Sequence, residues 1–198
     1  MKLRAPPPGF VELQRAIPGL ALDIGYASNA NFTGAPLPGY GAAGAWLLER
    51  AATSLGELHA ELGTRGLGLV CFDAYRPRRA TLAMVAWAER TGHRHLLDEG
   101  FISATSWHNH GVAVDVSLVE LATGARLDLG TAWDTFTPAS RPENAAGAAL
   151  ERRTLLRAMM TAHGWKGATT EWWHFRFLTA DTLPRDVPYG AEEAEETQ

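Results

Sequence analysis

Two short stretches of the sequence carry side chains that could hold a metal ion. Residues 106–115 (SWHNHGVAVD) contain a hydroxyl, two imidazoles and a carboxylate, and residues 171–174 (EWWH) add another carboxylate and another imidazole. Catalytic zinc is typically held by three protein ligands, and it keeps a fourth position for water. We therefore predict that the two stretches converge on one metal ion, with two imidazoles and one carboxylate as ligands and a second carboxylate left over.

The spacing of His108 and Asp115 requires a change of chain direction between them. They are seven residues apart, so in one straight strand they would lie on opposite faces, about 23 Å from each other. Gly111 interrupts the stretch, and a regular apolar alternation begins only at Val112. A reversal at this glycine would bring the imidazole back beside the carboxylate. We therefore expect a bend at Gly111, followed by a strand that carries Asp115.

Glu171 and His174 are three residues apart, and the aromatic alternation after them favours a strand, so a bend near Trp172 is needed. A catalytic metal lowers the pKa of a water towards ~7 and polarises a carbonyl. The spare carboxylate could take a proton from that water and pass it to a leaving amine. Arg76 ends an apolar run and is restricted to extended geometry by Pro77. It could therefore stabilise the oxyanion that develops.

Each of these residues also has an ordinary structural explanation. His108 or His110 could cap a helix or lie in the core, and Asp115 could cap a turn. Two histidines and one carboxylate also form the facial triad of non-haem iron oxygenases, although that triad would leave Glu171 unexplained. From the residues alone, a metal site and a set of structural side chains both stay open.

Composition limits the class of protein. The 198 residues suffice for one well-buried core and are short for two. The net charge of −4 gives no basic field for nucleic acid, and the single cysteine, Cys71, excludes an internal disulfide framework. We find neither a signal peptide nor an apolar run of ~20 residues. We expect a cytoplasmic protein that binds neither nucleic acid nor membrane; its oligomeric state is not indicated.

Hydrophobic periodicity outlines the fold. Helical spacing of apolar residues occurs in 46–62, 81–90 and 144–163, and extended runs predict strands at 22–27, 67–75, 112–119 and 172–178. A turn at Thr123-Gly124 predicts that 125–129 returns antiparallel. We expect an α+β single domain over 1–198, with an antiparallel sheet packed against helices and a central zinc cleft. Residues 1–20 are expected to be an extended lead-in and 190–198 a disordered acidic tail.

Several motifs together resemble those of the zinc D-alanyl-D-alanine dipeptidases of the vancomycin-resistance (VanX-like) type. Residues 106–115 match SxHxxGxAxD, 171–174 match EWWH, and 73–77 (DAYRP) match D-x-Y-R-P. Residues 31–34 (NFTG) with the tyrosine after them, and Trp133-Asp134, resemble the dipeptidase branch in particular. The wider group includes D,D-carboxypeptidases, L-Ala-D-Glu endopeptidases and the Hedgehog signalling domain.

The resemblance implies a catalytic role for each matching residue. It implies His108, Asp115 and His174 as the ligands of one Zn²⁺ per chain, which decides between the two neighbouring histidines of the first stretch. It implies Glu171 as the general base and Arg76 as the group that stabilises the tetrahedral intermediate.

The resemblance also implies a substrate, the dipeptide D-Ala-D-Ala, hydrolysed to two D-alanines. Asp134 and Tyr26 would hold its ammonium group, and Ser106 and Tyr40 its carboxylate. The reaction would serve glycopeptide resistance, by removing a peptidoglycan precursor, or the recycling of wall-derived dipeptide. The alternatives are a D,D-carboxypeptidase or L-Ala-D-Glu endopeptidase of the same group and, outside enzymes, a non-catalytic zinc-binding module.

Overall fold

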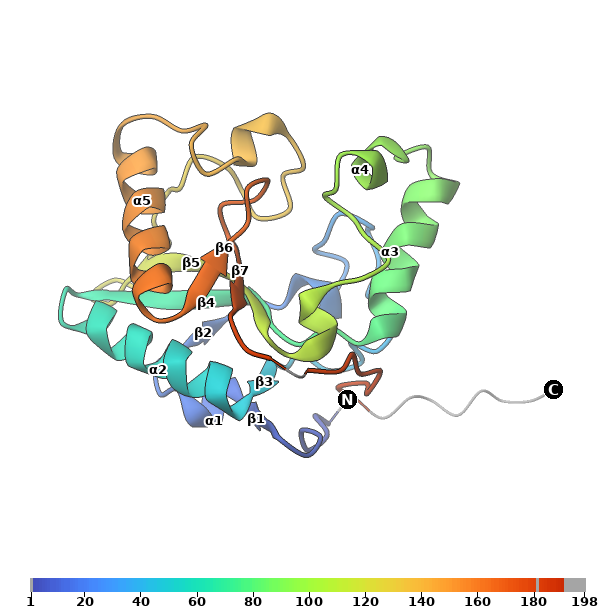
Figure 1. Ribbon diagram of the computed structural model, residues 1–198, viewed down its shortest axis with the longest axis horizontal. Helices are drawn as coiled ribbons and strands as arrows, with labels where there is room; N and C mark the ends of the chain where they lie inside the picture. The colour runs from blue at the N-terminus through green and yellow to red at the C-terminus, as the bar shows by residue number, and fades with distance from the viewer. Residues whose placement is uncertain (1, 181, 191–198) are drawn as a thin grey trace.

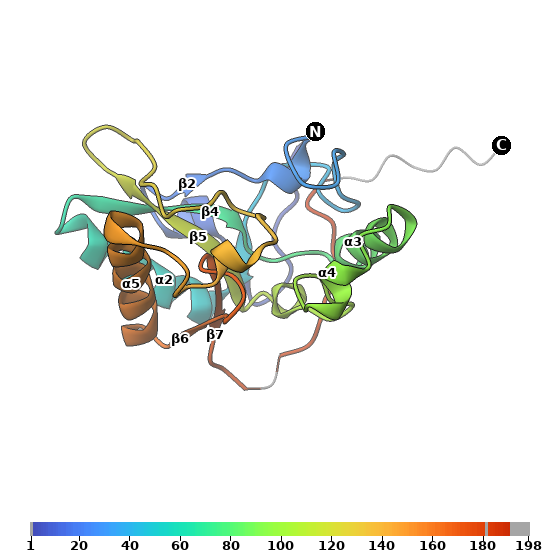
Figure 2. The ribbon, with the colours of Figure 1, turned by 90° about the horizontal axis from the view of Figure 1, so that it is seen from above.

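A computed structural model describes residues 2–180 and 182–190 (Figure 1, Figure 2). Its centre is a five-stranded sheet in the order β2-β4-β5-β7-β6. The strands are β2 (Ala21–Leu22), β4 (Leu67–Asp73), β5 (Ala113–Glu120), β6 (Trp165–Gly167) and β7 (His174–Phe177). β2 pairs with β4 in parallel, and the other neighbours are antiparallel. The predicted α+β class is confirmed, with a mixed rather than purely antiparallel sheet.

Helices pack at two separate places around this sheet. α2 (Glu49–Gly63) and α5 (Gly147–Ala162) pack against the sheet, whereas α3 (Arg78–Arg90) and α4 (His95–Asp98) lie at the opposite end of the molecule (Figure 1). α3 begins directly after Pro77, which has no N–H to leave unpaired at a helix start. Because β4 and β5 are buried almost throughout, they read as nearly continuous apolar runs.

The N-terminal segment is more ordered than the extended lead-in expected for residues 1–20. β1 (Phe10–Glu12) pairs antiparallel with β3 (Trp46–Leu48), and α1 (Leu13–Ala16) follows β1 directly. The same pairing holds Trp46–Leu48 in β3, so the helix predicted from Trp46 begins only at Glu49. An apolar repeat cannot by itself separate the end of a strand from the first turn of a helix.

Two other predicted strands are shorter than expected. The strand predicted at 22–27 ends at Leu22, and the chain turns into the 3₁₀-helix η1 (Gly25–Ala27), which buries Tyr26. The return strand predicted at 125–129 is reduced to a single bridge between Val119 and Arg126. The alternation of apolar residues identified both segments as extended, but it could not show how few of their residues pair with a neighbouring strand.

The acidic tail predicted at 190–198 lies outside the described residues except for Gly190, which forms a bridge with Leu3. Cys71 is buried in β4, as a small apolar residue would be. Within the described part of the chain, no helix is long and apolar enough to cross a membrane.

Candidate metal centre

Three acidic or imidazole side chains lie in one row across the middle of the sheet. Asp73 on β4 is paired with Asp115 on β5, and Asp115 is paired in turn with His174 on β7. Residues directly opposite each other on neighbouring strands project from the same face, with Cβ atoms about 4.5–5.5 Å apart. The strand register therefore brings together one residue from each of the two predicted stretches.

His108 reaches the same point through the predicted bend. It lies in the 3₁₀-helix η2 (Trp107–His110), where Ser106 caps the start by accepting a hydrogen bond from the His108 N–H at 3.2 Å. Gly111 ends the helix with φ at 69°, in the left-handed region, and a Cβ there would overlap the ring of Phe10. The bend at this glycine is confirmed, and it returns His108 to the side of Asp115.

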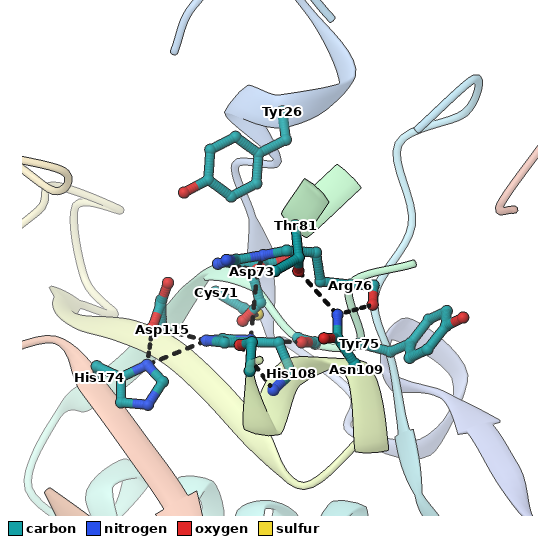
Figure 3. Close-up of polar contacts among 12 residues, drawn as sticks. Tyr26, Cys71, Asp73, Tyr75, Arg76, Thr81, His108, Asn109, Asp115 and His174 are labelled. Atoms are coloured by element: carbon teal, nitrogen blue, oxygen red, sulfur yellow. Dashed lines mark hydrogen bonds and ion pairs between the residues drawn. The ribbon is translucent and has the colours of Figure 1, made fainter. Parts of the chain in front are cut away.

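One side-chain atom from each of the three candidate ligands lies at the same point, as Figure 3 shows. Nε2 of His108 lies 3.0 Å from Nδ1 of His174, and Oδ1 of Asp115 lies 3.3 Å and 3.0 Å from these two nitrogens. Ligands about 2.0–2.1 Å from a tetrahedral zinc ion lie roughly 3.3–3.4 Å apart, so the donor set fits such an ion. Among the described residues, these three form the cluster that could hold a metal.

A backbone carbonyl determines which ring nitrogen of His108 carries a hydrogen. Its Nδ1 lies 2.6 Å from the carbonyl oxygen of Ala74, which can only accept, so Nδ1 carries the proton. In the neutral ring the lone pair of Nε2 then points at the cluster, which is the arrangement typical of a metal-bound histidine. Burial alone would raise the pKa of Asp115, but the neighbouring His108 and His174 outweigh it and hold that pKa well below its usual range.

Asp73 connects Arg76 to the cluster, a role that the sequence did not reveal. Its Oδ2 accepts a hydrogen bond from Nε of Arg76 at 2.9 Å and forms an ion pair with Nη2 of the same guanidinium at 2.8 Å. The same oxygen lies 3.3 Å from Nδ1 of His108 (Figure 3). The Arg76 guanidinium also lies 5.2 Å from the centre of the Tyr26 ring. Asp73 belongs to the DAYRP motif, but its contact with His108, 35 positions away, depends on the fold.

Glu171 lies in the turn that precedes β7, so the predicted bend near Trp172 is present. The turn is held by the Trp172 N–H, which donates to the carbonyl of Ser140 at 2.9 Å, at the end of the 3₁₀-helix η3 (Pro138–Ser140). Burial, reinforced by the charge of Asp115, raises the pKa of Glu171 to about 8. Such a carboxylate is a stronger base than an exposed one.

One cavity of about 150 Å³ adjoins all the predicted catalytic residues. Its lining contains Tyr26, Arg76, Gly100, Phe101, Ile102, Ser103, Thr105, Ser106, Trp107, His108, Asp115, Asp134, Phe136, Glu171 and His174. The wall made by Phe101 and Phe136, whose rings lie 5.6 Å apart, was not predicted. The cavity thus combines a metal-ligand cluster with an acid, an arginine and an apolar wall.

Asp134 and Tyr26, the two residues expected to hold a substrate ammonium group, are in contact at the lining of this cavity. The Tyr26 hydroxyl donates to Oδ2 of Asp134 at 2.8 Å. Asp134 has φ at 57°, a left-handed conformation that aspartate tolerates better than most residues. Burial, together with the charges of Asp115 and Glu171, raises the pKa of Asp134 well above its ordinary value. A cationic partner would favour the ionised form of this carboxyl group.

The structure separates the two residues predicted to bind a substrate carboxylate. Ser106 lines the cavity, and its oxygen accepts from the His108 N–H, so its own hydroxyl hydrogen can still be donated. Tyr40 is fully buried outside the lining, and its hydroxyl donates to Oδ1 of Asp73. His110, the other histidine of the first stretch, contacts Thr182 through Nδ1 and is not part of the cluster.

Comparison with known proteins shows the family of the chain. The profile of the peptidase M15 family, described as D-ala-D-ala dipeptidase, matches residues 7–189. A D-alanyl-D-alanine dipeptidase of Streptomyces coelicolor is 31% identical in an alignment of 181 positions that covers 84% of this chain and 90% of that protein. A protein of the same name from Escherichia coli strain K12 is 32% identical over 88% of each chain.

Among solved structures, VanYB in complex with D-alanine-D-alanine is similar at 14% identity and a TM-score of 0.44, over 69% of this chain and 74% of that one. The family match is the stronger finding, because it covers nearly the whole chain, including both metal-ligand stretches. With the His-Asp-His cluster in place, the chain belongs to the M15 family of metallopeptidases, among its D-Ala-D-Ala dipeptidases.

Proposed function

We propose that this protein hydrolyses the free dipeptide D-Ala-D-Ala to two D-alanines with one zinc ion per chain. The observation that carries the proposal is a single cavity in which a His-Asp-His cluster adjoins a carboxyl group of raised pKa, an arginine and a second acid. Peptide hydrolysis needs an activated water, a proton carrier and a cation for the oxyanion, and this set offers candidates for each.

His108, Asp115 and His174 would hold the metal. A zinc ion bound there supplies Lewis acidity, which lowers the pKa of a water towards ~7 and polarises a carbonyl. Zinc suits this site better than the iron of an oxygenase, because Glu171 adjoins the cluster as an additional carboxylate with a role in hydrolysis.

Glu171 would act as the general base and then as the general acid. Its carboxylate takes a proton from the water that attacks the peptide carbonyl carbon. The C–N bond breaks as the same proton passes to the leaving amine, so the first D-alanine leaves with its carboxylate and the second with its new amino group. Arg76, held by a hydrogen bond and an ion pair to Asp73, would stabilise the negative charge on the carbonyl oxygen.

The two ends of the dipeptide would bind at opposite charges. Asp134, supported by Tyr26, would pair with the ammonium group, and the hydroxyl of Ser106 would donate to the carboxylate. We leave Tyr40 out of the proposed pocket, because its hydroxyl is already bonded to Asp73. An ammonium site favours a dipeptidase over a D,D-carboxypeptidase or L-Ala-D-Glu endopeptidase, whose substrates carry an acyl group at this position.

A non-catalytic zinc-binding module fits less well, because it would need neither Glu171 nor Arg76 beside the metal ligands. In the cell, the proposed reaction would remove a peptidoglycan precursor, as in glycopeptide resistance, or recycle wall-derived dipeptide. Either role suits a cytoplasmic location, which we include in the proposal.

Metal removal tests the proposed function. Protein treated with a strong chelator should lose hydrolysis of D-Ala-D-Ala, because the polarising ion is gone. Titration with zinc should restore the rate, and the rate should reach its plateau at one zinc ion per chain. Release of D-alanine is the readout. Full activity in protein shown to be free of metal would contradict the proposal.

Asp134→Asn tests the ammonium site. Asparagine tolerates the same left-handed backbone and can still accept from Tyr26, but it carries no charge. A hydrogen bond to a charged group contributes about 1.5–3 kcal/mol, so kcat/KM for the free dipeptide should fall about 10- to 150-fold while zinc stays bound. Asp128→Asn, an exposed acid in the same loop, is the control and should leave kcat/KM unchanged. An unchanged kcat/KM in Asp134→Asn would remove this residue from the pocket.

A further inference from the structure

The two oxygens of the Asp115 carboxylate have different surroundings. Oδ1 faces the imidazole nitrogens of His108 and His174 at 3.3 and 3.0 Å. Oδ2 faces away from them and accepts a hydrogen bond of 3.3 Å from the indole N–H of Trp133. The strand register fixes the backbone of Asp115, but the last torsion of an aspartate side chain is broad. The indole is thus the group on Oδ2 that can select one orientation of the carboxylate.

Trp133 is itself held in place on two sides. Its ring is stacked on Phe72, with centres 5.3 Å apart and planes 15° apart, and it packs against Tyr26 at 4.7 Å. Gly25 makes room for it, because a Cβ at that position would lie 2.9 Å from the indole ring. A ring fixed by such contacts keeps its N–H in one direction, so the hydrogen bond to Asp115 does not depend on a mobile side chain.

Trp133 also connects the metal cluster to the proposed ammonium site. It directly precedes Asp134, and it contacts Tyr26, whose hydroxyl donates to Asp134. One aromatic residue therefore contacts the candidate metal ligand Asp115 on one side. On the other side it contacts Tyr26, which supports the candidate ammonium-binding residue Asp134.

We infer that Trp133 is a positioning residue for the metal ligand Asp115: its indole N–H occupies Oδ2, so that only Oδ1 is presented to the metal. This inference rests on the proposed function, because it assumes that Asp115 binds a metal. Hydrogen-bond partners of metal ligands commonly contribute about 10- to 100-fold in metal affinity. Without the indole N–H, the carboxylate can rotate and present both oxygens.

Trp133→Phe is the direct test, because phenylalanine keeps an aromatic ring between Phe72 and Tyr26 but has no N–H. The dissociation constant for zinc, measured by competition with a chelator, should rise about 10- to 100-fold. The cobalt(II)-substituted protein supplies a second readout: a carboxylate that binds through both oxygens raises the coordination number, and the visible absorption bands should weaken. Loss of packing alone would not change the cobalt spectrum in this way.

Trp165→Phe is the matched control. Trp165 is a buried tryptophan whose indole N–H donates at 3.0 Å to Ser54, a residue outside the metal cluster. This variant loses the same kind of hydrogen bond but should keep wild-type zinc affinity and the wild-type cobalt spectrum. If Trp133→Phe does not fold, a tryptophan analogue with sulfur in place of the indole N–H keeps the shape of the side chain, and the same two readouts apply.

The outcomes separate this inference from the proposed function. Wild-type protein that binds zinc and hydrolyses the dipeptide, together with a Trp133 variant of unchanged zinc affinity and cobalt spectrum, would overturn the inference alone. Wild-type protein that takes up no zinc would overturn the proposed function and the inference with it. Weaker zinc binding with a changed cobalt spectrum in the Trp133 variant, and not in Trp165→Phe, would support the inference.

Discussion

Glu171→Gln should lower kcat for D-Ala-D-Ala about 10²- to 10⁴-fold and leave zinc bound, because general acid–base catalysis typically contributes this much to the rate. Glutamine has nearly the same shape as glutamate but cannot accept the proton. The three proposed metal ligands come from other residues, so the metal site should stay intact. Steady-state kinetics and the zinc content of the purified variant check both halves of this expectation.

The control for this variant is Glu151→Gln, which removes an exposed carboxylate of α5 that does not line the cavity. It should behave as wild type. Glu171→Gln protein that is free of zinc, under conditions in which wild type holds it, would show that Glu171 helps to bind the metal. A kcat within a few-fold of wild type would mean that another group carries the proton.

Arg76→Lys should also be severely damaged, with the loss mainly in kcat. Nε of Arg76 donates to Asp73, Nη2 forms an ion pair with the same carboxylate, and Nη1 donates to the sulfur of Met84, so the guanidinium is fixed in one plane at the lining of the cavity. The ammonium of lysine is a point charge on a flexible chain, and it cannot reproduce this planar set of donors. Loss of one donor to a developing oxyanion typically lowers kcat about 10²- to 10³-fold.

Arg78→Lys is the matched control, since Arg78 is an exposed arginine two residues along the same segment. The two variants should be compared for kcat and KM separately, because an interaction made only in the transition state affects kcat. Near-wild-type kcat in Arg76→Lys would show that a different group stabilises the intermediate. An equal loss in Arg78→Lys would show that replacing an arginine of this segment lowers kcat even where its side chain does not line the cavity.

Local sequence was sufficient to predict the bend that forms the metal cluster. A glycine between His108 and the apolar alternation leaves few other ways to bring that imidazole back to Asp115, and the strand begins at Ala113, one residue after the position expected. The bend before His174 followed from similar reasoning. In both cases the signal lies within ten residues, where spacing and residue type constrain the backbone directly.

Contacts between distant segments could not be predicted in this way. The pairing of β1 with β3 converted the start of an expected helix at Trp46 into a strand. Tyr40 was assigned to the pocket by resemblance, whereas its hydroxyl is bonded to Asp73, 33 positions away. The indole of Trp133 reaches Asp115 only because a loop folds back over the sheet. These positions depend on tertiary packing, which periodicity and motif spacing do not describe.

The ratio of kcat/KM for free D-Ala-D-Ala to that for N-acetyl-D-Ala-D-Ala tests the dipeptidase proposal most directly. Acetylation removes the ammonium charge and leaves the scissile bond and the carboxylate unchanged. If Asp134 pairs with that ammonium, the zinc-loaded protein should prefer the free dipeptide by about 10- to 150-fold, the equivalent of one charge-assisted hydrogen bond. Equal or faster hydrolysis of the acetylated dipeptide would contradict the proposal and identify the protein as a carboxypeptidase.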